Sequence, residues 1–448
     1  ASTDDTRVTG YRVMRDGQLI TTTHGTSAEL TGLACGTDYG IAVEASDAAG
    51  NASGAETTAA RTAECASHDS PSSPAPEPAT AIAEPPPSVF LAPAGNDAAP
   101  CTAAQPCQTL QRGYQAAGPG QVVELAGGDY PGGTIAHDSA KAGGENVVMR
   151  PAAGASVSVG SQIKIYAEDL EIRNLSTSSW QTYSTARDVT LRDIDAGYMS
   201  IKSSRTVRVI GGSVGPGVDY HPTIIGFGTT RPPQNILVDG VDFHDWTRSN
   251  SSVHTECLQI AAGDDVVIRN STFRNCHATG NIHVTNYGDS PITRNITIEN
   301  NFLSKTVDSF DPDGFAFYSI QAHAYPGLKI RYNSALQGFI LFKEGGAFQD
   351  VEVVGNVAPK PSWGCNDGVE YSHNVWYSDG AAPAKCDATD LPVALSNPGF
   401  VNPSALDLRL TAGSPAIGRG DPNDHPARDI DGQERPQGGA VDAGADER

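Results

Sequence analysis

Histidines, glutamines, a glutamate and a lysine recur at matching positions between residues 221 and 343. Several short apolar stretches here carry a polar residue between two apolar ones, as in Cys257-Leu-Gln-Ile260 and Asn281-Ile-His-Val284. If these stretches are β-strands stacked in register, their polar residues form a row about 4.8 Å apart on one face. The row and its flanks predict one cluster of His221, His254, Glu256, Gln259, His283, Gln321, His323 and Lys343.

These residue types can transfer protons and stabilise charge. β-Elimination in a uronic-acid polysaccharide needs a base to remove the proton next to the carboxylate, and a cation to neutralise that carboxylate. His254, His283 and Lys343 are candidate bases, because a crowded positive cluster or burial lowers such a pKa towards neutrality. We expect the catalytic residues to be His254, Glu256, His283, Lys343 and His221.

Two other interpretations remain open for the same face. Hydrolysis of a glycan needs two carboxylic groups across the scissile bond, and the candidates are Asp219, Glu256, Asp311 and Asp313. Parallel β-solenoids also stack polar residues for hydrogen bonding alone, so a row of this kind can be purely structural.

Further residues are candidates for binding metal and substrate. Asp308, Asp311 and Asp313 offer the oxygen ligands that Ca²⁺ takes, although a hydrogen-bonded turn looks the same in sequence. Calcium is therefore the one cofactor we expect. Aromatic residues on the long loops can stack on sugar rings or pack the loops down. The expected substrate-binding residues are Gln259, Gln321, His323, Tyr220, Tyr287 and Trp246.

A repeated unit must position these residues. It consists of alternating apolar residues followed by a polar Asn, Asp or Gly turn, as in Leu170-Glu-Ile-Arg-Asn174 and Ile296-Thr-Ile-Glu-Asn300. Eight copies begin 18 to 32 residues apart, between residues 170 and 351. Such a period, with no helix between strands, predicts a solenoid of parallel β coils. The middle coils are the longest, and extra loops are where function concentrates.

Aligning the coils predicts which residues point into the solenoid. The stretch before each repeat forms a second strand, with Gln259, His283 and Gln321 between inward neighbours. The predicted inward residues are Ile225, Leu258, Ile282, Ile320 and Ile340, then Phe227, Ile260, Val284, Ala322 and Phe342.

Both ends of this region resemble a known family. Cys101-Thr-Ala-Ala-Gln-Pro-Cys107 with Gly118-Pro-Gly-Gln-Val-Val-Glu-Leu125, and the later Asp429-Ile-Asp-Gly-Gln-Glu-Arg-Pro436, are similar to segments of pectate-lyase-like β-helix proteins. The resemblance implies an all-β fold, a right-handed parallel β-helix, over residues 88–448. Phe342-Lys343-Glu344-Gly345-Gly346 resembles the strand end that carries the lysine base in one pectate lyase family. The fold hosts lyases, hydrolases, epimerases and adhesins, so it does not select an activity.

The N-terminal residues 1–65 resemble a fibronectin type III module without its first strands. Val8-Thr-Gly-Tyr-Arg-Val13, Thr37-Asp-Tyr39 and the strand through Ile41, Val43 and Ala45 carry that resemblance. We expect the chain to start inside the module. Residues 66–87 are rich in Pro and Ser and predict an extended linker.

Composition indicates a secreted protein. The net charge of −22 disfavours binding to nucleic acid or anionic membranes, and no stretch is long and apolar enough to span a bilayer. Eight cysteines fall into the neighbouring pairs Cys35/Cys65, Cys101/Cys107, Cys257/Cys276 and Cys365/Cys386, which predicts local disulfides in an oxidising compartment. No leader opens the sequence, so we expect that any signal peptide has been removed or was never included.

The sequence thus favours a secreted, monomeric enzyme that cleaves a polysaccharide substrate. A lyase acting by β-elimination on a uronic-acid glycan is preferred. A glycoside hydrolase using the same cleft and a non-catalytic glycan-binding or adhesive surface protein are the alternatives.

Overall fold

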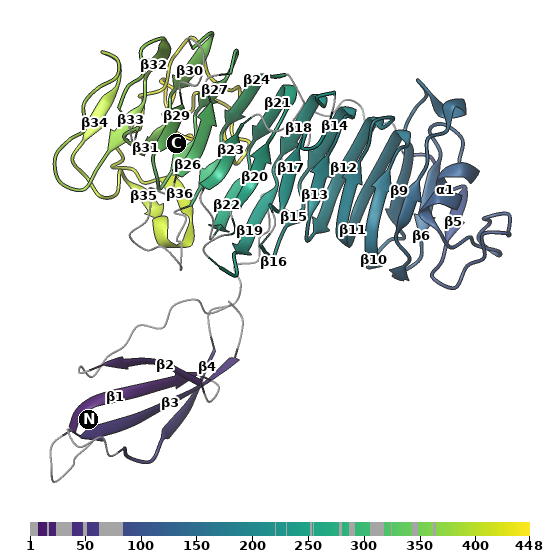
Figure 1. Ribbon diagram of the computed structural model, residues 1–448, viewed down its shortest axis with the longest axis horizontal. Helices are drawn as coiled ribbons and strands as arrows, with labels where there is room; N and C mark the ends of the chain where they lie inside the picture. The colour runs from purple at the N-terminus through teal and green to yellow at the C-terminus, as the bar shows by residue number, and fades with distance from the viewer. Residues whose placement is uncertain are drawn as a thin grey trace. The chain divides into compact units, whose positions relative to one another are not determined.

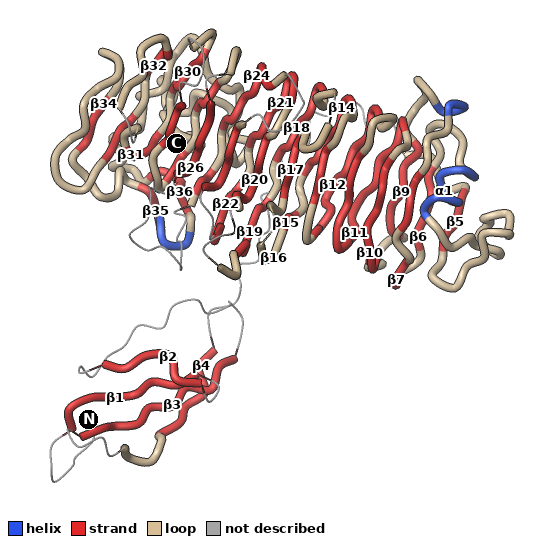
Figure 2. The backbone as a smooth tube through the Cα atoms, viewed as in Figure 1, coloured by secondary structure: helices blue, strands red, loops and turns tan. Residues whose placement is uncertain are grey.

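The computed structural model describes residues 8–15, 18–23, 38–47, 52–61, 84–219, 221–229, 231–250, 253, 255–276, 280–285, 292–304, 318–323, 325–342, 348–361 and 364–448. The chain divides into two compact units, residues 1–77 and 78–448. In both units the described secondary structure is almost entirely β (Figures 1 and 2).

The first unit is an antiparallel sheet in the order β2-β1-β3-β4. Its strands are β1 (Val8–Arg15), β2 (Gln18–Thr23), β3 (Asp38–Asp47) and β4 (Glu56–Arg61). Val13 and Ala45 are buried, whereas all of β4 is exposed. The sheet therefore has a small described core, as expected for part of a sandwich.

The second unit is a right-handed parallel β-helix whose described strands form a 30-stranded sheet with parallel pairings throughout. The pairings fall into three runs along the solenoid, here called sheets 1, 2 and 3. Sheet 1 contains β5 (Val89–Leu91), β6 (Val122–Leu125), β9 (Val147–Pro151), β11 (Glu168–Thr182), β12 (Arg187–Ala196), β14 (Arg205–Ile210), β18 (Gln234–Asp239), β21 (Gly263–Arg269), β24 (Thr293–Glu299), β27 (Lys329–Arg331), β30 (Val351–Val354) and β32 (Val369–Ser372).

The long strands β11 and β12 bend from sheet 1 into sheet 2. Sheet 2 continues with β7 (Gly128–Tyr130), β10 (Val157–Ile165), β15 (Ser213–Val214), β16 (Gly217–Val218), β19 (Asp242–Thr247), β22 (Thr272–Cys276), β25 (Phe302–Leu303), β28 (Ser334–Ala335), β31 (Val357–Pro359), β33 (Val375–Tyr377) and β34 (Leu391–Val393).

Sheet 3 carries most of the residues singled out from the sequence. Together with the later parts of β10 and β11, it contains β8 (Gly133–Ile135), β13 (Met199–Ile201), β17 (Thr223–Ile225), β20 (Glu256–Ile260), β23 (Gly280–Val284), β26 (Tyr318–His323) and β29 (Phe339–Phe342).

The core lies on the solenoid axis, where inward residues of one coil rest on those of the next. Leu258, Ile282 and Ile320 are fully buried on successive strands of sheet 3. The rings of Phe243 and Phe273 stack 4.5 Å apart in sheet 2. At about 25 cal/mol for each Å² of apolar surface removed from water, this repeated burial is the main stabilising term of the fold.

The polar turn predicted after each repeat is a single residue in the left-handed conformation. It lets the chain turn from sheet 1 to sheet 2, and Asn and Asp tolerate this conformation better than most side chains. The residues with positive φ at this corner include Asn174, Asp193, Asn270, Asn300, Tyr332 and His373.

A buried row of asparagines follows that corner. The side-chain nitrogens of Asn301, Asn333 and Asn356 each donate to the side-chain oxygen of the next asparagine, at 3.0 Å. The row continues through Asn374 to the carboxylate of Asp390, 3.1 Å away. Because each asparagine also bonds to the backbone of neighbouring coils, the row satisfies buried polar groups at the tightest bend.

Both ends of the solenoid carry additional elements. Helix α1 (Leu110–Ala116) lies near β5 and β6 (Figure 1), and the 3₁₀ helix η1 (Ser139–Lys141) follows it in the chain. Thr109 caps α1 by accepting a hydrogen bond from the backbone nitrogen of Arg112.

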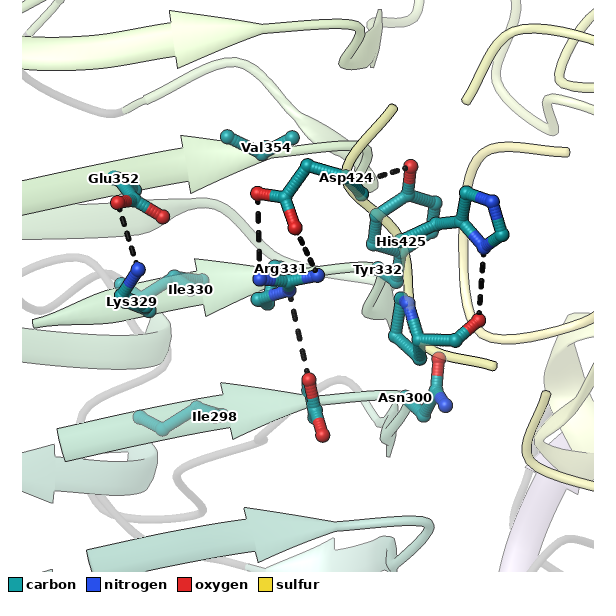
Figure 3. Close-up of polar contacts among 12 residues, drawn as sticks. Ile298, Asn300, Lys329, Ile330, Arg331, Tyr332, Glu352, Val354, Asp424 and His425 are labelled. Atoms are coloured by element: carbon teal, nitrogen blue, oxygen red, sulfur yellow. Dashed lines mark hydrogen bonds and ion pairs between the residues drawn. The ribbon is translucent and has the colours of Figure 1, made fainter. Parts of the chain in front are cut away.

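The last 50 or so residues fold back over the final coils. They include β35 (Phe400–Asn402), η2 (Pro403–Ala405) and β36 (Asp407–Leu410). Arg331 of β27 is held between Glu299 of β24 at 3.5 Å and Asp424 of this C-terminal segment at 2.9 Å, as Figure 3 shows. The ion pair between Arg331 and Asp424 therefore anchors the segment to the coil of β27 by charge as well as by packing.

Three of the four predicted disulfides are confirmed: Cys101–Cys107, Cys257–Cys276 and Cys365–Cys386. Cys35 and Cys65 lie outside the described residues. Glu84, in the predicted linker, forms ion pairs with Arg150 at 2.8 Å and Arg173 at 2.9 Å. This end of the predicted linker therefore lies against sheet 1.

Candidate functional site

The predicted polar row exists on sheet 3. Gln259 pairs with His283, and His283 pairs with Gln321, on strands β20, β23 and β26. Their neighbours Leu258 and Ile260 point inward and are fully buried. The register inferred from the sequence is therefore confirmed on these three strands.

A glutamate lies between two imidazole rings at this row. Oε2 of Glu256 is 2.9 Å from Nδ1 of His221, and Oε1 is 3.5 Å from Nδ1 of His283. His221 Nδ1 also lies 3.1 Å from the backbone nitrogen of Glu256. A protonated Nδ1 can thus donate to the carboxylate, and an unprotonated Nδ1 can accept from the backbone N–H.

His283 connects this pair to the next coil. Its Nε2 lies 3.2 Å from the side-chain nitrogen of Gln321, and its ring is 6.0 Å from the ring of His323. The ring of His323 lies at the same distance from that of Tyr325. We call Glu256, His221, His283, Gln321 and His323 the Glu256 cluster.

The cluster is less exposed than the sequence suggests. Glu256, Gln259 and His283 expose only 1%, 2% and 3% of their surface, whereas the side chain of His221 exposes 20%. Residues that point away from a solenoid axis were expected to lie open to solvent. Strand alternation gives the direction of these side chains but not their exposure, so the sequence did not reveal this burial.

Two strands depart from the predicted register. Ile225 pairs with Ile260, two positions beyond the expected partner Leu258. Phe227, predicted to point inward, is 50% exposed. The reason is that β17 ends at Ile225 and the chain turns through Gly226 and Gly228, both with positive φ.

On β29 the register is shifted by one residue. Phe339 pairs with Ile320, and Ile340 pairs with Gln321, so the prediction that Ile340 points inward was wrong. The side chain of Phe342, also predicted to point inward, is not among those that the structure describes. The large ring of Phe339 occupies the interior instead, 6.3 Å from the ring of Trp376. His323 consequently pairs with Phe342 rather than with the predicted row partner Lys343.

Trp246 was expected to bind sugar, but it is 5% exposed on β19. A Cβ added at Gly217 would lie 1.8 Å from its ring, so the indole packs directly on that glycine. The ring therefore packs the loop, which was the alternative interpretation. The other predicted site residues lie outside the described residues: His254, Lys343, Tyr220, Tyr287, Asp308, Asp311 and Asp313.

Asp219, two residues before His221 in the sequence, carries a negative charge. Asp219 accepts hydrogen bonds from the backbone nitrogen and the hydroxyl of Ser249, at 2.5 and 2.7 Å. These bonds lower the pKa of Asp219, so this carboxylate stays ionised at neutral pH.

The sequence analysis missed a cation on the same sheet. Lys202 follows β13, and its backbone nitrogen bonds to Thr182 of the preceding coil. The alternation of inward and outward residues that located Gln259 also places Lys202 on the outward face. Lys202 lies before the long middle coils, where the candidate residues were expected.

Within the described part of the chain, no group of three or more His, Cys, Asp or Glu side chains is arranged to hold a metal ion. No helix among those residues has the length and apolar character needed to cross a membrane. The aspartates expected to bind calcium lie in the undescribed stretch 305–317.

No protein-family model matches the chain. By sequence, it is similar to Chitinase D of Niallia circulans (53% identical over 58 residues), Chitinase Chi52 of Paenibacillus xylanexedens (52% over 58) and Exoglucanase B of Cellulomonas fimi (55% over 53). These matches span 12–13% of this chain and 11%, 11% and 5% of those proteins. They fit the N-terminal fibronectin type III-like region.

Two solved structures resemble the chain. Pectate lyase Pel9A is 15% identical with a TM-score of 0.45, covering 81% of this chain and 97% of its own. The family 28 exopolygalacturonase of Yersinia enterocolitica is 11% identical with a TM-score of 0.33, covering 85% and 90%. The chain combines a parallel β-helix with a fibronectin type III-like module, as predicted, and the β-helix assignment rests on its own strand pairings.

Proposed function

We propose that this protein is a secreted enzyme that cleaves a polysaccharide at the Glu256 cluster, by β-elimination next to a uronic-acid carboxylate. The observation that carries the proposal is the Glu256 carboxylate, placed between the Nδ1 atoms of His221 and His283. A carboxylate in contact with one ring nitrogen fixes the tautomer of an imidazole and leaves the other nitrogen for proton transfer.

His221 is the proposed base, because it is the more exposed of the two histidines that contact Glu256. The proposal uses the tautomer of His221 whose Nδ1–H donates to Glu256, in place of the tautomer whose Nδ1 accepts from the backbone N–H of Glu256. In that tautomer Nε2 can take the proton from the carbon next to the substrate carboxylate. The C–H electron pair forms the new C=C bond, and the glycosidic C–O bond breaks. The leaving oxygen keeps the electron pair of the broken C–O bond and takes a proton from the protonated His221.

His283 has a positioning role in this proposal. Gln321 contacts its Nε2 and Glu256 approaches its Nδ1, so both ring nitrogens have polar neighbours. A ring held in this way fixes the second carboxylate oxygen of Glu256. These steps do not use calcium or a base at His254 or Lys343. The sequence predicts that Asp308, Asp311 and Asp313 bind calcium, and these residues lie outside the described ones.

The partial relatives support a setting in which polysaccharides are degraded. Two are named chitinases and one an exoglucanase, and the shared region is a small module that is accessory in this proposal. Three disulfides support an oxidising, extracellular environment.

Hydrolysis is the second candidate, favoured by one observation. The hydrogen bonds from Ser249 lower the pKa of Asp219 and keep this carboxylate ionised. Glu256, in contrast, is buried. Two carboxyl groups in different environments are the requirement for an acid and its partner in glycoside hydrolysis.

The test is a panel of acidic and neutral polysaccharides incubated with the full chain. β-Elimination produces unsaturated ends, which absorb in the ultraviolet, together with new reducing ends. New reducing ends without that absorbance would replace the lyase by the hydrolase. If neither signal appears on any polymer, the chain is a binding protein and the proposed chemistry is wrong.

Variants locate the site. His221→Ala and Glu256→Gln should each lower kcat by 100-fold or more, because each removes the base or the group that orients it. The sequence predicted an exposed face, on which substitutions would leave stability unchanged. Because Glu256 is buried, the Glu256→Gln variant also needs a melting curve. Leu258→Ala is the matched control: it should cost about 2–5 kcal/mol of stability and retain turnover below its melting temperature. Near-normal kcat in both His221→Ala and Glu256→Gln would place the chemistry elsewhere.

A further inference from the structure

A second set of outward residues precedes the Glu256 cluster on sheet 3. Ile165, Thr182 and Ile201 pair on β10, β11 and β13, so the residues that follow them stand on successive coils. These are Tyr166, Tyr183 and Lys202. The backbone nitrogens of Tyr183 and Lys202 each bond to the carbonyl of the coil before, at 2.9 and 3.2 Å. The three side chains therefore form one row.

The row fixes the position of a cation. The rings of Tyr166 and Tyr183 stack 4.5 Å apart and 6° from parallel. Nζ of Lys202 lies 5.2 Å from the centre of the Tyr183 ring, within the range of a cation–π interaction. Each aromatic ring thus supports the next group along the row, and Lys202 is held at its end.

A second lysine lies on the same face without an acidic partner. Lys164 is exposed on β10 and pairs with Gln181. Neither Lys164 nor Lys202 forms an ion pair with a carboxylate in the part of the chain that the structure describes. On sheet 1 of nearby coils the pattern is different, because Arg173 and Arg192 are both paired with Glu171. Lys164 and Lys202 therefore differ from these two arginines, because neither lysine has such a carboxylate partner among the described residues.

The row continues from Lys202 towards the Glu256 cluster. Gly226 is the next residue in the row, bonded to Ile201 at 2.8 Å, and a Cβ there would lie 2.2 Å from the carbonyl oxygen of Ala262. Beside it, Phe227 exposes half of its surface. One coil later, at Ala261, the row is completely buried. Lys202 lies two coils, about 10 Å, before that point.

We propose that Lys164, Lys202 and Phe227 bind an acidic polysaccharide chain along sheet 3, upstream of the Glu256 cluster. The lysines pair with sugar carboxylates, and the exposed ring of Phe227 packs on a sugar face. An anionic occupant is favoured because two unpaired cations stand together on a chain of net charge −22. The inference rests on the proposed function and names the charge of its substrate.

The experiment measures retardation in native gels that contain polygalacturonate, alginate or, as the neutral polymer, hydroxyethylcellulose. At least one acidic polymer should retard the parent, and added salt should weaken that binding. Lys164→Gln/Lys202→Gln should weaken it about 10-fold or more, and Phe227→Ala several-fold. Lys360→Gln is the charge-matched control for each lysine, since Lys360 is exposed after β31 of sheet 2. It should bind as the parent does.

The single variant Lys164→Gln, at an exposed position, is the fallback if the double variant folds poorly. The inference is overturned if no acidic polymer retards the parent, or if the lysine variants bind as well as Lys360→Gln. Lysine-dependent binding without cleavage would keep this inference and remove the proposed function. Cleavage that is insensitive to Lys164 and Lys202 would do the reverse.

Discussion

Asp446 shows how burial changes the chemistry of a single residue in the C-terminal segment. It exposes 4% of its surface, and one carboxylate oxygen accepts a hydrogen bond from the backbone nitrogen of Leu410 at 2.6 Å. Burial, with a smaller contribution from Asp429 and Asp431, raises the pKa of Asp446 to about 7. An unfolded Asp has a pKa of about 3.9, so the folded state holds this proton more tightly.

The contribution of Asp446 to the free energy of unfolding is therefore largest below about pH 4, and it is lost as the pH rises through about 7. Asp446→Asn keeps an acceptor oxygen without the charge. It should therefore be more stable than the parent at pH 8, by on the order of 4 kcal/mol for a pKa raised by about three units. At pH 4 the variant and the parent should melt at the same temperature. Thermal melts at pH 4, 6 and 8 measure the difference.

Asp407→Asn provides a control of opposite sign. Its hydrogen bond and charge interaction with Arg409 lower the pKa of Asp407, so its contribution is present above about pH 4 and lost on acidification. That variant should lose stability at pH 8 and approach the parent at low pH. An Asp446→Asn advantage that does not change between pH 4 and pH 8 would contradict the assignment.

At the scale of the element, the asparagine row decides how firmly the later coils are joined. Asn333 donates to Ile298 and Asn356 and accepts from the backbone and side chain of Asn301, all while fully buried. Removing it leaves several buried polar groups without partners, each costing about 1–3 kcal/mol. Asn333→Ala should therefore lower the free energy of unfolding by about 3 kcal/mol or more.

Denaturant unfolding followed by circular dichroism measures this loss. The control is Asn295→Ala at an exposed position of β24 on the preceding coil, where the side chain bonds to Asp264. Asn295 has positive φ, so some loss is expected, but less than for Asn333. If the two variants were equally stable, the buried row would be unimportant.

The same elements show what the sequence could predict. The coils were recognisable because alternating apolar residues and a left-handed Asn or Asp corner recur together, as at Ile296–Asn300. The Gln259–His283–Gln321 row followed directly from that period. The predicted register was wrong on two strands. Strand β17 ends early, before Gly226, and the ring of Phe339 lies in the core in place of Ile340.

The contacts of the candidate site were harder to foresee than its residues. His221 approaches Glu256 across 35 residues, a distance set by loops whose course no strand period encodes. Burial of His283 likewise depends on what covers sheet 3. The role of Asn333 was not foreseen either, because its bonds to other coils depend on how the coils stack.

At the scale of the whole molecule, the two compact units predict independent folding. Removing residues 1–77 should leave the melting temperature of the β-helix unchanged within a few degrees, because the division falls between the units. Removing residues 1–87 should lower it measurably, since Glu84 and its ion pairs to Arg150 and Arg173 are lost. Differential scanning calorimetry of both truncations makes the comparison. Loss of the β-helix transition in the shorter truncation would show that the units depend on each other.

The return of the C-terminal segment has a consequence for how the chain is made. The side chain of Asn300 donates to the carbonyl of Arg428, which is 128 residues later. The hydroxyl of Tyr332 donates to the carbonyls of Asp421 and Asp424, which are 89 and 92 residues later. At roughly 5–20 residues per second of synthesis, those groups wait on the order of ten seconds for their partners. The early coils have neighbours as soon as they emerge, whereas the late ones are completed only after residues 421–428 have been translated.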